Sequence, residues 1–453
     1  MNKEHLEKDV KDHPSDPEAH FQLGDFLLDS GDLQESVDSF MRVLRIDSGY
    51  GKAYIKLGKA YMKLNRMQEA MNSMINAIKL LPDSLEAYLL QGQACLGAGC
   101  KREAVETLEE AGKLFLDEPM IPFRLGMALA ESKEYVEAEK AYRKAIELKP
   151  DFAQAHNNLG AMYMNLGMSL MAAKSFDEAA AIDPGNAVYM DNLGRAYAGL
   201  LKYDDAVKFH LESLKRNPRR AATHLHISQT YLKMERRALA LQAARKAVEL
   251  DENNPDNNLH LAEILVNGGY LDEIRDGLKI CKECLKRWPD QVDVLNRVAL
   301  MYLHSCQTYK DSSTLQINGW QKAEELLGKA LKIEPDNVVL HRNIATAIMI
   351  QGIGGEYTKK AVKHLSEIVR LSPDSAEDHF KLGRYLMRSK FNRQGEDDIE
   401  HLQQAVHYLK KAIRLDPKIS EAYTRLAEAY DQLGWEQLAE ETRKKREENT
   451  GVS

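Results

Sequence analysis

The amino-acid sequence predicts an all-α solenoid of about twelve antiparallel helix hairpins, and three residue types at fixed spacing predict it. Glycine recurs every 34 residues in the first half of the chain, at Gly24, Gly58, Gly92, Gly126, Gly160 and Gly194. Twelve residues after this small residue the regular repeats usually have alanine, and twelve residues further on they usually have proline. A constant period of this length is typical of stacked supersecondary units that share one continuous core.

Each repeat is numbered here so that the small residue is position 8, which makes Pro17 position 1 of the first repeat. Position 8 is then always Gly, Ala or Ser, and position 20 is alanine in ten of twelve repeats. Small residues at both positions allow two helices, A and B, to cross closely. Eight of the 13 prolines stand at position 32, where a residue without an amide hydrogen follows the end of helix B. Each repeat is therefore predicted to be a helix hairpin.

The repeats divide the chain into four segments. Residues 1–16 are predicted to form an N-terminal capping helix, and seven regular 34-residue repeats fill 17–254 without a gap. Five further repeats fill 255–443, beginning near 255, 292, 338, 376 and 420. Repeats 8 to 11 gain 3, 12, 4 and 10 residues between helices A and B, which predicts longer hairpin loops. In repeat 11 the insert is expected to lengthen helix B after Asp397 or Asp398 caps it. Residues 444–453 are predicted to be a polar end that shields the last hairpin.

Composition narrows the classes of function. The net charge of −7 over 453 residues argues against nucleic acid as the partner, because proteins that bind nucleic acid usually carry a basic excess. No apolar run reaches the roughly 20 residues of a membrane span, and no signal peptide is visible at the start. The five cysteines have no framework of spacings and are typical of a reducing compartment. We therefore expect a cytoplasmic protein that does not bind membranes.

The pattern of small and proline positions, together with tyrosine at position 11 in six repeats, resembles the tetratricopeptide repeat family over nearly the whole chain. The resemblance implies a right-handed superhelix of helix pairs in which helix A of every repeat lines a concave groove. Positions 2, 5, 6, 9 and 13 of helix A lie opposite the stripe that packs on helix B. These positions are therefore the predicted groove positions.

Polar side chains recur at position 6 of helix A, and four successive repeats place Asn158, Asn192, His226 and His260 there. An amide offers both a donor and an acceptor, so a row of amides can hold an extended peptide by its backbone. We expect these side chains to form a ladder of hydrogen-bonding groups along the groove. The alternative interpretation is that they hydrogen-bond neighbouring helices or face water.

Two further clusters are candidate contacts with a partner. Repeat 2 places Lys52, Lys56 and Lys59 on one basic stripe, which suits an acidic segment, although ion pairs with acidic residues of adjacent repeats are the alternative. Repeat 4 is predicted to present an apolar pocket around a cation on its groove face, formed by Phe123, Arg124 and Met127. The alternative for these three residues is burial against the adjacent repeats.

Several specific chemistries are not predicted. Cys281 and Cys284 form a CxxC motif, but they fall on the packing face of a helix B and no second CxxC supplies the other ligands of a zinc site. The cochaperones of this family that grip a C-terminal carboxylate use a basic residue at position 5 and asparagine at position 9. Here only Arg342 is basic at position 5, and Thr346 follows it at position 9. We expect no metal, no other cofactor and no carboxylate-clamp binding of chaperones.

The repeats use the whole chain, which leaves no room for a catalytic domain. The sequence therefore predicts a non-catalytic scaffold or adaptor that binds an extended protein or peptide segment in its groove. One alternative is a substrate-targeting or regulatory subunit of a separately encoded enzyme. A less favoured alternative is an RNA-binding helical repeat.

Overall fold

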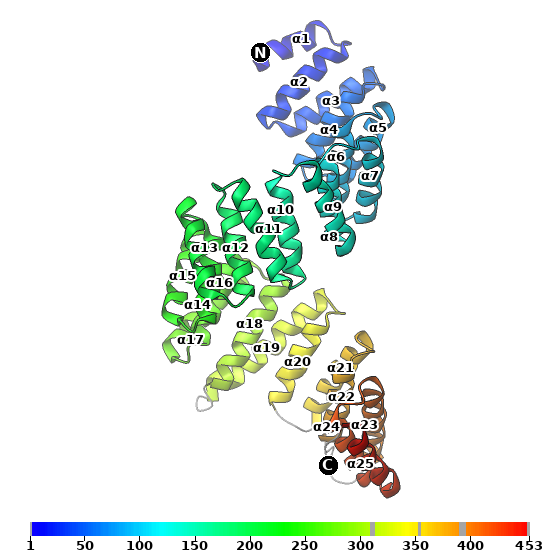
Figure 1. Cartoon of the computed structure of the whole chain (residues 1–453), viewed down its shortest axis with the longest axis vertical. Helices are drawn as coiled ribbons and strands as arrows, with labels where there is room; N and C mark the ends of the chain where they lie inside the picture. The colour runs from blue at the N-terminus through cyan, green and yellow to red at the C-terminus, as the bar shows by residue number, and fades with distance from the viewer. Residues whose placement is uncertain (1, 309–312, 352–354, 389–395, 451–453) are drawn as a thin grey trace. The chain divides into compact units, whose positions relative to one another are not determined.

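The computed structural model describes residues 2–308, 313–351, 355–388 and 396–450. The described residues form 25 α-helices and no strands, so the fold is all-α as predicted. They divide into two compact units, Met1–Arg219 (unit 1) and Arg220–Ser453 (unit 2), and the boundary lies between repeats 6 and 7. Within each unit consecutive helices pack side by side as antiparallel pairs (Figure 1). No described helix is long and apolar enough to cross a membrane.

Unit 1 contains an N-terminal helix and six hairpins. Its helices are α1 (Lys3–Asp12), α2 (Pro17–Ser30), α3 (Leu33–Ile46), α4 (Gly51–Lys63), α5 (Met67–Leu80), α6 (Leu85–Gly97), α7 (Lys101–Leu114), α8 (Met120–Glu131), α9 (Tyr135–Leu148), α10 (Ala153–Asn165), α11 (Ser169–Ile182), α12 (Ala187–Gly199) and α13 (Tyr203–Arg216). Asn2 caps α1 by accepting a hydrogen bond from the His5 amide, and α1 packs on α2 with Leu6 buried.

Unit 2 contains six hairpins. Its helices are α14 (Ala221–Lys233), α15 (Arg237–Leu250), α16 (Pro255–Val266), α17 (Leu271–Arg287), α18 (Val292–Thr308), α19 (Ser313–Ile333), α20 (Val338–Gln351), α21 (Gly355–Leu371), α22 (Ala376–Arg388), α23 (Glu396–Leu415), α24 (Ser420–Gln432) and α25 (Glu436–Thr450). The polar end predicted for 444–453 continues helix α25 as far as Thr450, and residues 451–453 lie outside the described part of the chain.

Helices A and B cross closely because a small residue at position 8 usually faces a larger residue at position 24. A Cβ atom at Gly160 would lie 2.8 Å from the ring of Phe176, and one at Gly126 would lie 2.8 Å from the ring of Tyr142. Where position 8 is larger the opposite residue is smaller, as in the pair of Ser228 with Ala244. In the hairpins with glycine at position 8, a large side chain from helix B thus fills the space that the glycine leaves.

The extra residues of repeats 8 and 9 mostly lengthen helices and do not form the predicted loops, whereas in repeat 11 helix B is lengthened as expected. Helices α17 and α18 have 17 residues each, α19 has 21 and α23 has 20. The helices of the regular repeats have 12 to 14 residues. The remaining inserted residues at 309–312, 352–354 and 389–395 lie outside the described residues.

Candidate functional site

The amides at position 6 connect adjacent helices A. Asn192 of α12 donates from Nδ2 to Oδ1 of Asn157 on α10 over 2.8 Å. The same contact recurs in unit 2, where Asn343 of α20 donates from Nδ2 to Oδ1 of Asn296 on α18 over 2.7 Å. In both cases a position 6 amide donates to the position 5 amide of the preceding repeat. These hydrogen bonds between neighbouring helices are what the alternative interpretation expected.

The contact between repeats 5 and 6 is part of a longer polar row. Asn157 donates from Nδ2 to Oδ1 of Asn158 over 3.3 Å, and Arg195 donates from Nη1 to Oδ1 of Asn192 over 3.3 Å. All three amides are half-buried and Arg195 is exposed. The predicted rungs Asn158 and Asn192 are therefore joined to each other through Asn157, which the sequence did not single out.

The predicted apolar pocket of repeat 4 is wrong for Phe123. Its side chain is only 5% exposed, and its ring centroid lies 4.8 Å from that of Phe152 and 6.2 Å from that of Tyr142. Position 5 of helix A faces the following repeat, so the next hairpin covers it. Met127 is half-buried against the same apolar cluster. The part of this trio that remains a candidate contact is therefore Arg124 together with the edge of Met127.

Arg124 differs from the other cations at position 6. Its side chain is half-buried, its Nε is buried without a hydrogen-bond partner, and the described residues give it no carboxylate partner. The other four position 6 cations all pair with carboxylates, and these pairs are Lys56 with Asp25, Arg297 with Glu263, Lys381 with Glu377 and Arg425 with Glu428. Arg124 is thus a position 6 cation whose charge is not neutralised by an adjacent acid.

The basic stripe of repeat 2 is mostly neutralised. Lys56 pairs with Asp25 of α2, and Lys59 pairs with Glu86 of α6. The structure thus corrects the prediction of a free cationic patch at these two residues, because the adjacent repeats supply the acids. Lys52 is exposed at the start of α4 and has no ion pair within the described residues.

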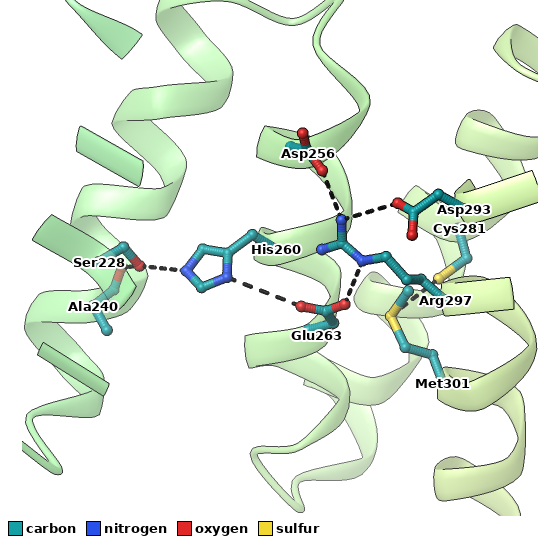
Figure 2. A network of polar contacts seen from close by, with 9 residues as sticks. All are labelled: Ser228, Ala240, Asp256, His260, Glu263, Cys281, Asp293, Arg297 and Met301. Carbon is teal, nitrogen blue, oxygen red and sulfur yellow. Dashed lines mark hydrogen bonds and ion pairs between the residues drawn. The ribbon is translucent and has the colours of Figure 1, made fainter. Parts of the chain in front are cut away.

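The predicted groove residue His260 is instead buried between helices, with 6% of its surface exposed (Figure 2). Its Nε2 lies 2.9 Å from the Ser228 hydroxyl, which itself donates to the carbonyl of Ala240 over 2.7 Å. Because the serine proton is used in that bond, Nε2 of His260 must be the donor to Ser228. Burial lowers the pKa of His260, and the nearby Glu263 carboxylate opposes this effect. His226, one repeat earlier, is half-buried.

The order Ser228, His260 and Glu263 resembles a hydrolytic triad only in residue types. Ser228 is 0% exposed and cannot meet a substrate. The His260 Nδ1 is 4.0 Å from Glu263, whose other oxygen accepts from Arg297 Nε over 2.8 Å. Arg297 also donates to Asp256 over 2.8 Å and to Asp293 over 3.5 Å (Figure 2). The network therefore joins α14, α16 and α18 and does not form a nucleophile.

The two cysteines of the CxxC motif lie in the core of unit 2. Cys281 and Cys284 are 0% and 1% exposed, and the Cys281 sulfur lies 3.6 Å from the sulfur of Met301 (Figure 2). Burial raises the pKa of both thiols, and it raises that of Cys284 to about 11. Both positions therefore pack as expected for a helix B and favour the neutral thiol. Among the described residues no group of three or more His, Cys, Asp or Glu is placed to hold a metal ion.

Sequence reasoning missed a pocket of about 250 Å³ between repeats 10 and 11. Helices α20, α21 and α22 line it with aliphatic side chains below and charged side chains around the mouth. The sequence did show Arg342 and Thr346 on one face of α20. It could not show that the packing of α22 leaves space beside them.

Comparison with known proteins agrees with the repeat register. Family profiles described as "Tetratricopeptide repeat" match residues 17–50, 51–84, 153–186, 221–254 and 408–441, and one described as "TPR repeat" matches 126–167. The mouse protein "Superkiller complex protein 3" is 26% identical over 238 residues, which are 51% of this chain. The match spans only 14% of the length of that curated relative.

Solved structures with similar repeats include yeast Tom70, which is 15% identical with a TM-score of 0.45 and covers 93% of this chain and 96% of its own. The human IFIT1 dimer with m7Gppp-AAAA is 14% identical with a TM-score of 0.45, over 84% of this chain and 94% of its own. The repeat register, the all-α hairpins and the family profiles lead to one conclusion. The chain belongs to the tetratricopeptide repeat family.

Proposed function

We propose that this protein is a non-catalytic scaffold that holds an extended, acidic segment of a partner protein along helices A of repeats 4 to 6. The surface consists of Arg124 on α8, the amides Asn157, Asn158 and Asn192, and Arg195 on α12. A substrate-targeting subunit of a separately encoded enzyme would use the same surface.

The main observation that supports the proposal is that the charge of Arg124 is unpaired within the described residues. Four other position 6 cations are neutralised by acids, whereas Arg124 has no acid partner among the described residues. Arg195 donates to an amide, and the described structure gives it no carboxylate either. A guanidinium binds a carboxylate through two parallel hydrogen bonds, so two such groups favour an acidic ligand.

The amides between the two arginines suit a peptide backbone. Each amide can donate two hydrogen bonds and accept two, and the contacts within the row use only part of this capacity. Helices pack at about 8–10 Å, so two repeats span roughly 16–20 Å. An extended chain covers that length with about five or six residues. Carboxylates about six residues apart therefore match Arg124 and Arg195.

The test uses a fluorescein-labelled peptide of four Glu-Gly-Ser triplets, which contains glutamates six residues apart. Fluorescence anisotropy should detect its binding to the full chain. Because hydrogen bonds to charged groups contribute roughly 1.5–3 kcal/mol each, changing Arg124→Glu with Arg195→Glu should weaken binding at least tenfold. The exposed Lys174 on α11 provides the matched control, and Lys174→Glu should change affinity less than twofold.

A twelve-uridine RNA with the same label tests the nucleic-acid alternative. Equal affinity of the double variant and the Lys174→Glu control for the peptide would reject the proposed surface. Tight RNA binding without peptide binding would replace it with an RNA-binding function. Lys52 in unit 1 and His226 in unit 2 remain predicted contacts, and this test does not depend on them.

A further inference from the structure

We propose that unit 2 carries a second, separate binding site, in which the pocket between repeats 10 and 11 takes one large apolar side chain of an acidic peptide. This site shares no residue with the surface of repeats 4 to 6. The proposal for this site therefore depends only on the residues of the pocket.

The floor of the pocket is aliphatic. Its lining includes Ala345 and Met349 of α20, Leu365 and Ile368 of α21, and Tyr385 of α22. A cavity of roughly 150 Å³ already holds a benzene ring in an apolar protein core. A pocket of about 250 Å³ is thus large enough for a phenylalanine or leucine side chain.

The position 6 side chain at this pocket differs in its contacts from the position 6 side chain of repeat 9. In repeat 9, Arg297 reaches back from α18 to Glu263 and Asp256 of α16, and its own side chain occupies the space between the helices. In repeat 11 the same position is Lys381, whose Nζ lies 2.6 Å from Glu377 one turn earlier on its own helix. Lys381 therefore leaves the space beside α20 open.

The pocket is lined by three cations and one acid, and each cation has a carboxylate within 4.0 Å. Arg342, Lys381 and Arg384 line it, whereas Asp378 is the one acidic residue of the lining. Asp378 is only 5% exposed and accepts two hydrogen bonds from Arg342 Nη2, at 3.1 and 3.2 Å. Arg384 is more weakly held, with Glu421 3.8 Å away and the ring of Phe380 5.4 Å from its guanidinium carbon. Arg384 is thus the cation best placed to contact an added carboxylate.

These features favour a peptide over RNA at this site. A nucleobase carries polar atoms around its edge, and burying them against an aliphatic floor without hydrogen bonds costs free energy. A hydrocarbon side chain has no such requirement, and its burial contributes about 25 cal/mol for each Å² removed from water. A glutamate or aspartate next to it in the sequence can then reach Arg384. The ligand is therefore an apolar residue flanked by acidic residues.

The experiment observes the pocket directly in the full chain. Protein with carbon-13-labelled methionine methyl groups is titrated with the blocked hexapeptide Gly-Ser-Phe-Glu-Glu-Gly, in a background of Arg124→Glu and Arg195→Glu that removes the first surface. The Met349 methyl resonance, assigned through Met349→Leu, should shift and saturate. Replacing the phenylalanine by alanine, or the glutamates by lysines, should weaken binding at least tenfold.

Two variants of the protein complete the test. Arg384→Glu should weaken binding at least tenfold, whereas Lys282→Glu, an exposed lysine on α17, should change it less than twofold. Thr346→Trp should cover the mouth of the pocket and so weaken peptide binding. If this variant does not fold, Arg384→Glu alone tests the site. The inference is wrong if Met349 does not respond, if the alanine peptide binds equally well, or if a six-uridine RNA shifts Met349 and the peptide does not. None of these outcomes bears on the first surface, which Arg124 and Arg195 test.

Discussion

At the scale of single residues, the polar groups on helix A have two different roles. Several of them hold adjacent repeats together, as the bond from Asn192 to Asn157 and the network around Arg297 do. A minority, of which Arg124 is the clearest, have no acid partner among the described residues. A position in the repeat therefore does not by itself identify a binding residue. The acids on the same helix or on the preceding helix A decide whether a cation is paired.

The first residue-scale prediction concerns Asn192. Asn192→Ala removes the donor to Asn157 Oδ1 and leaves that half-buried acceptor without its partner in the next repeat. The free energy of unfolding should fall by about 0.5–1.5 kcal/mol. Thermal denaturation followed by circular dichroism measures this. Gln154→Ala, at an exposed position of α10, is the control and should leave the melting temperature unchanged. A melting temperature equal in the two variants would show that the bond does not support the stack.

The second residue-scale prediction concerns a pair of histidines, one on α20 and one on α21. His341 donates from Nε2 to the carbonyl of Pro335 over 2.9 Å, so its Nδ1 accepts the proton of His364 Nδ1, 2.9 Å away. Burial lowers the pKa of His364 to about 4, with the neighbouring His341 contributing. An added proton on His364 would go to Nε2 and would place a positive charge in a half-buried ring beside His341.

The sign of the resulting pH dependence follows from that lowered pKa. In the unfolded chain His364 takes up a proton near pH 6.5, whereas in the folded chain it does so only near pH 4. The contribution of neutral His364 to the free energy of unfolding is therefore fully present above pH 6.5 and is lost as the pH falls towards 4. The loss is at most about 1.4 kcal/mol per pH unit and is smaller because His364 is half-buried. Melting curves at pH 7 and pH 5 should show a larger drop for the natural chain than for His364→Asn. An equal drop would contradict the shifted pKa.

At the scale of helices, the sizes of the residues at positions 8 and 24 are matched where position 8 is glycine. Gly160→Ala should destabilise the protein by about 1–3 kcal/mol, although alanine is the better helix former, because the added methyl group meets Phe176. Combining it with Phe176→Leu should recover part of the loss, since repeat 9 naturally pairs Ala299 with Leu327 at these positions. Chemical denaturation of the two single variants and the double variant measures the coupling. Strictly additive losses would show that the two positions do not touch.

The sequence was sufficient for the hairpins and their register, because small residues and prolines mark each crossing and each turn. It was not sufficient for the groove face. Phe123 was expected to be exposed, but one repeat considered alone does not show that the next hairpin covers position 5. His260 was misplaced for a related reason, since Ser228 of the preceding repeat offers it a buried partner. The inserts of repeats 8 and 9 were assigned to loops, yet they extend helices α17, α18 and α19, and only the longer helix B of repeat 11, α23, was expected.

At the scale of the whole molecule, the net charge of −7 makes binding of an acidic ligand a local property of a few cations. Two such places are proposed, one in each unit. Long-range attraction does not assist them, because the overall charge repels an acidic peptide. Binding at both sites depends on short-range pairs between a cation and a carboxylate. Added salt screens these pairs, so the affinity at both sites should fall as the salt concentration rises.

The most direct test of the central claim, that Arg124 and Arg195 bind acidic residues of a partner, is a charge exchange measured on the full chain. Fluorescence anisotropy would compare the Glu-Gly-Ser peptide with its Lys-Gly-Ser counterpart, against the natural chain and against Arg124→Glu with Arg195→Glu. The account predicts that the natural chain prefers the glutamate peptide and that the double variant prefers the lysine peptide. Both proteins should melt at the same temperature, because neither arginine has an ion pair to lose within the described residues. An unchanged preference in the double variant would contradict the account.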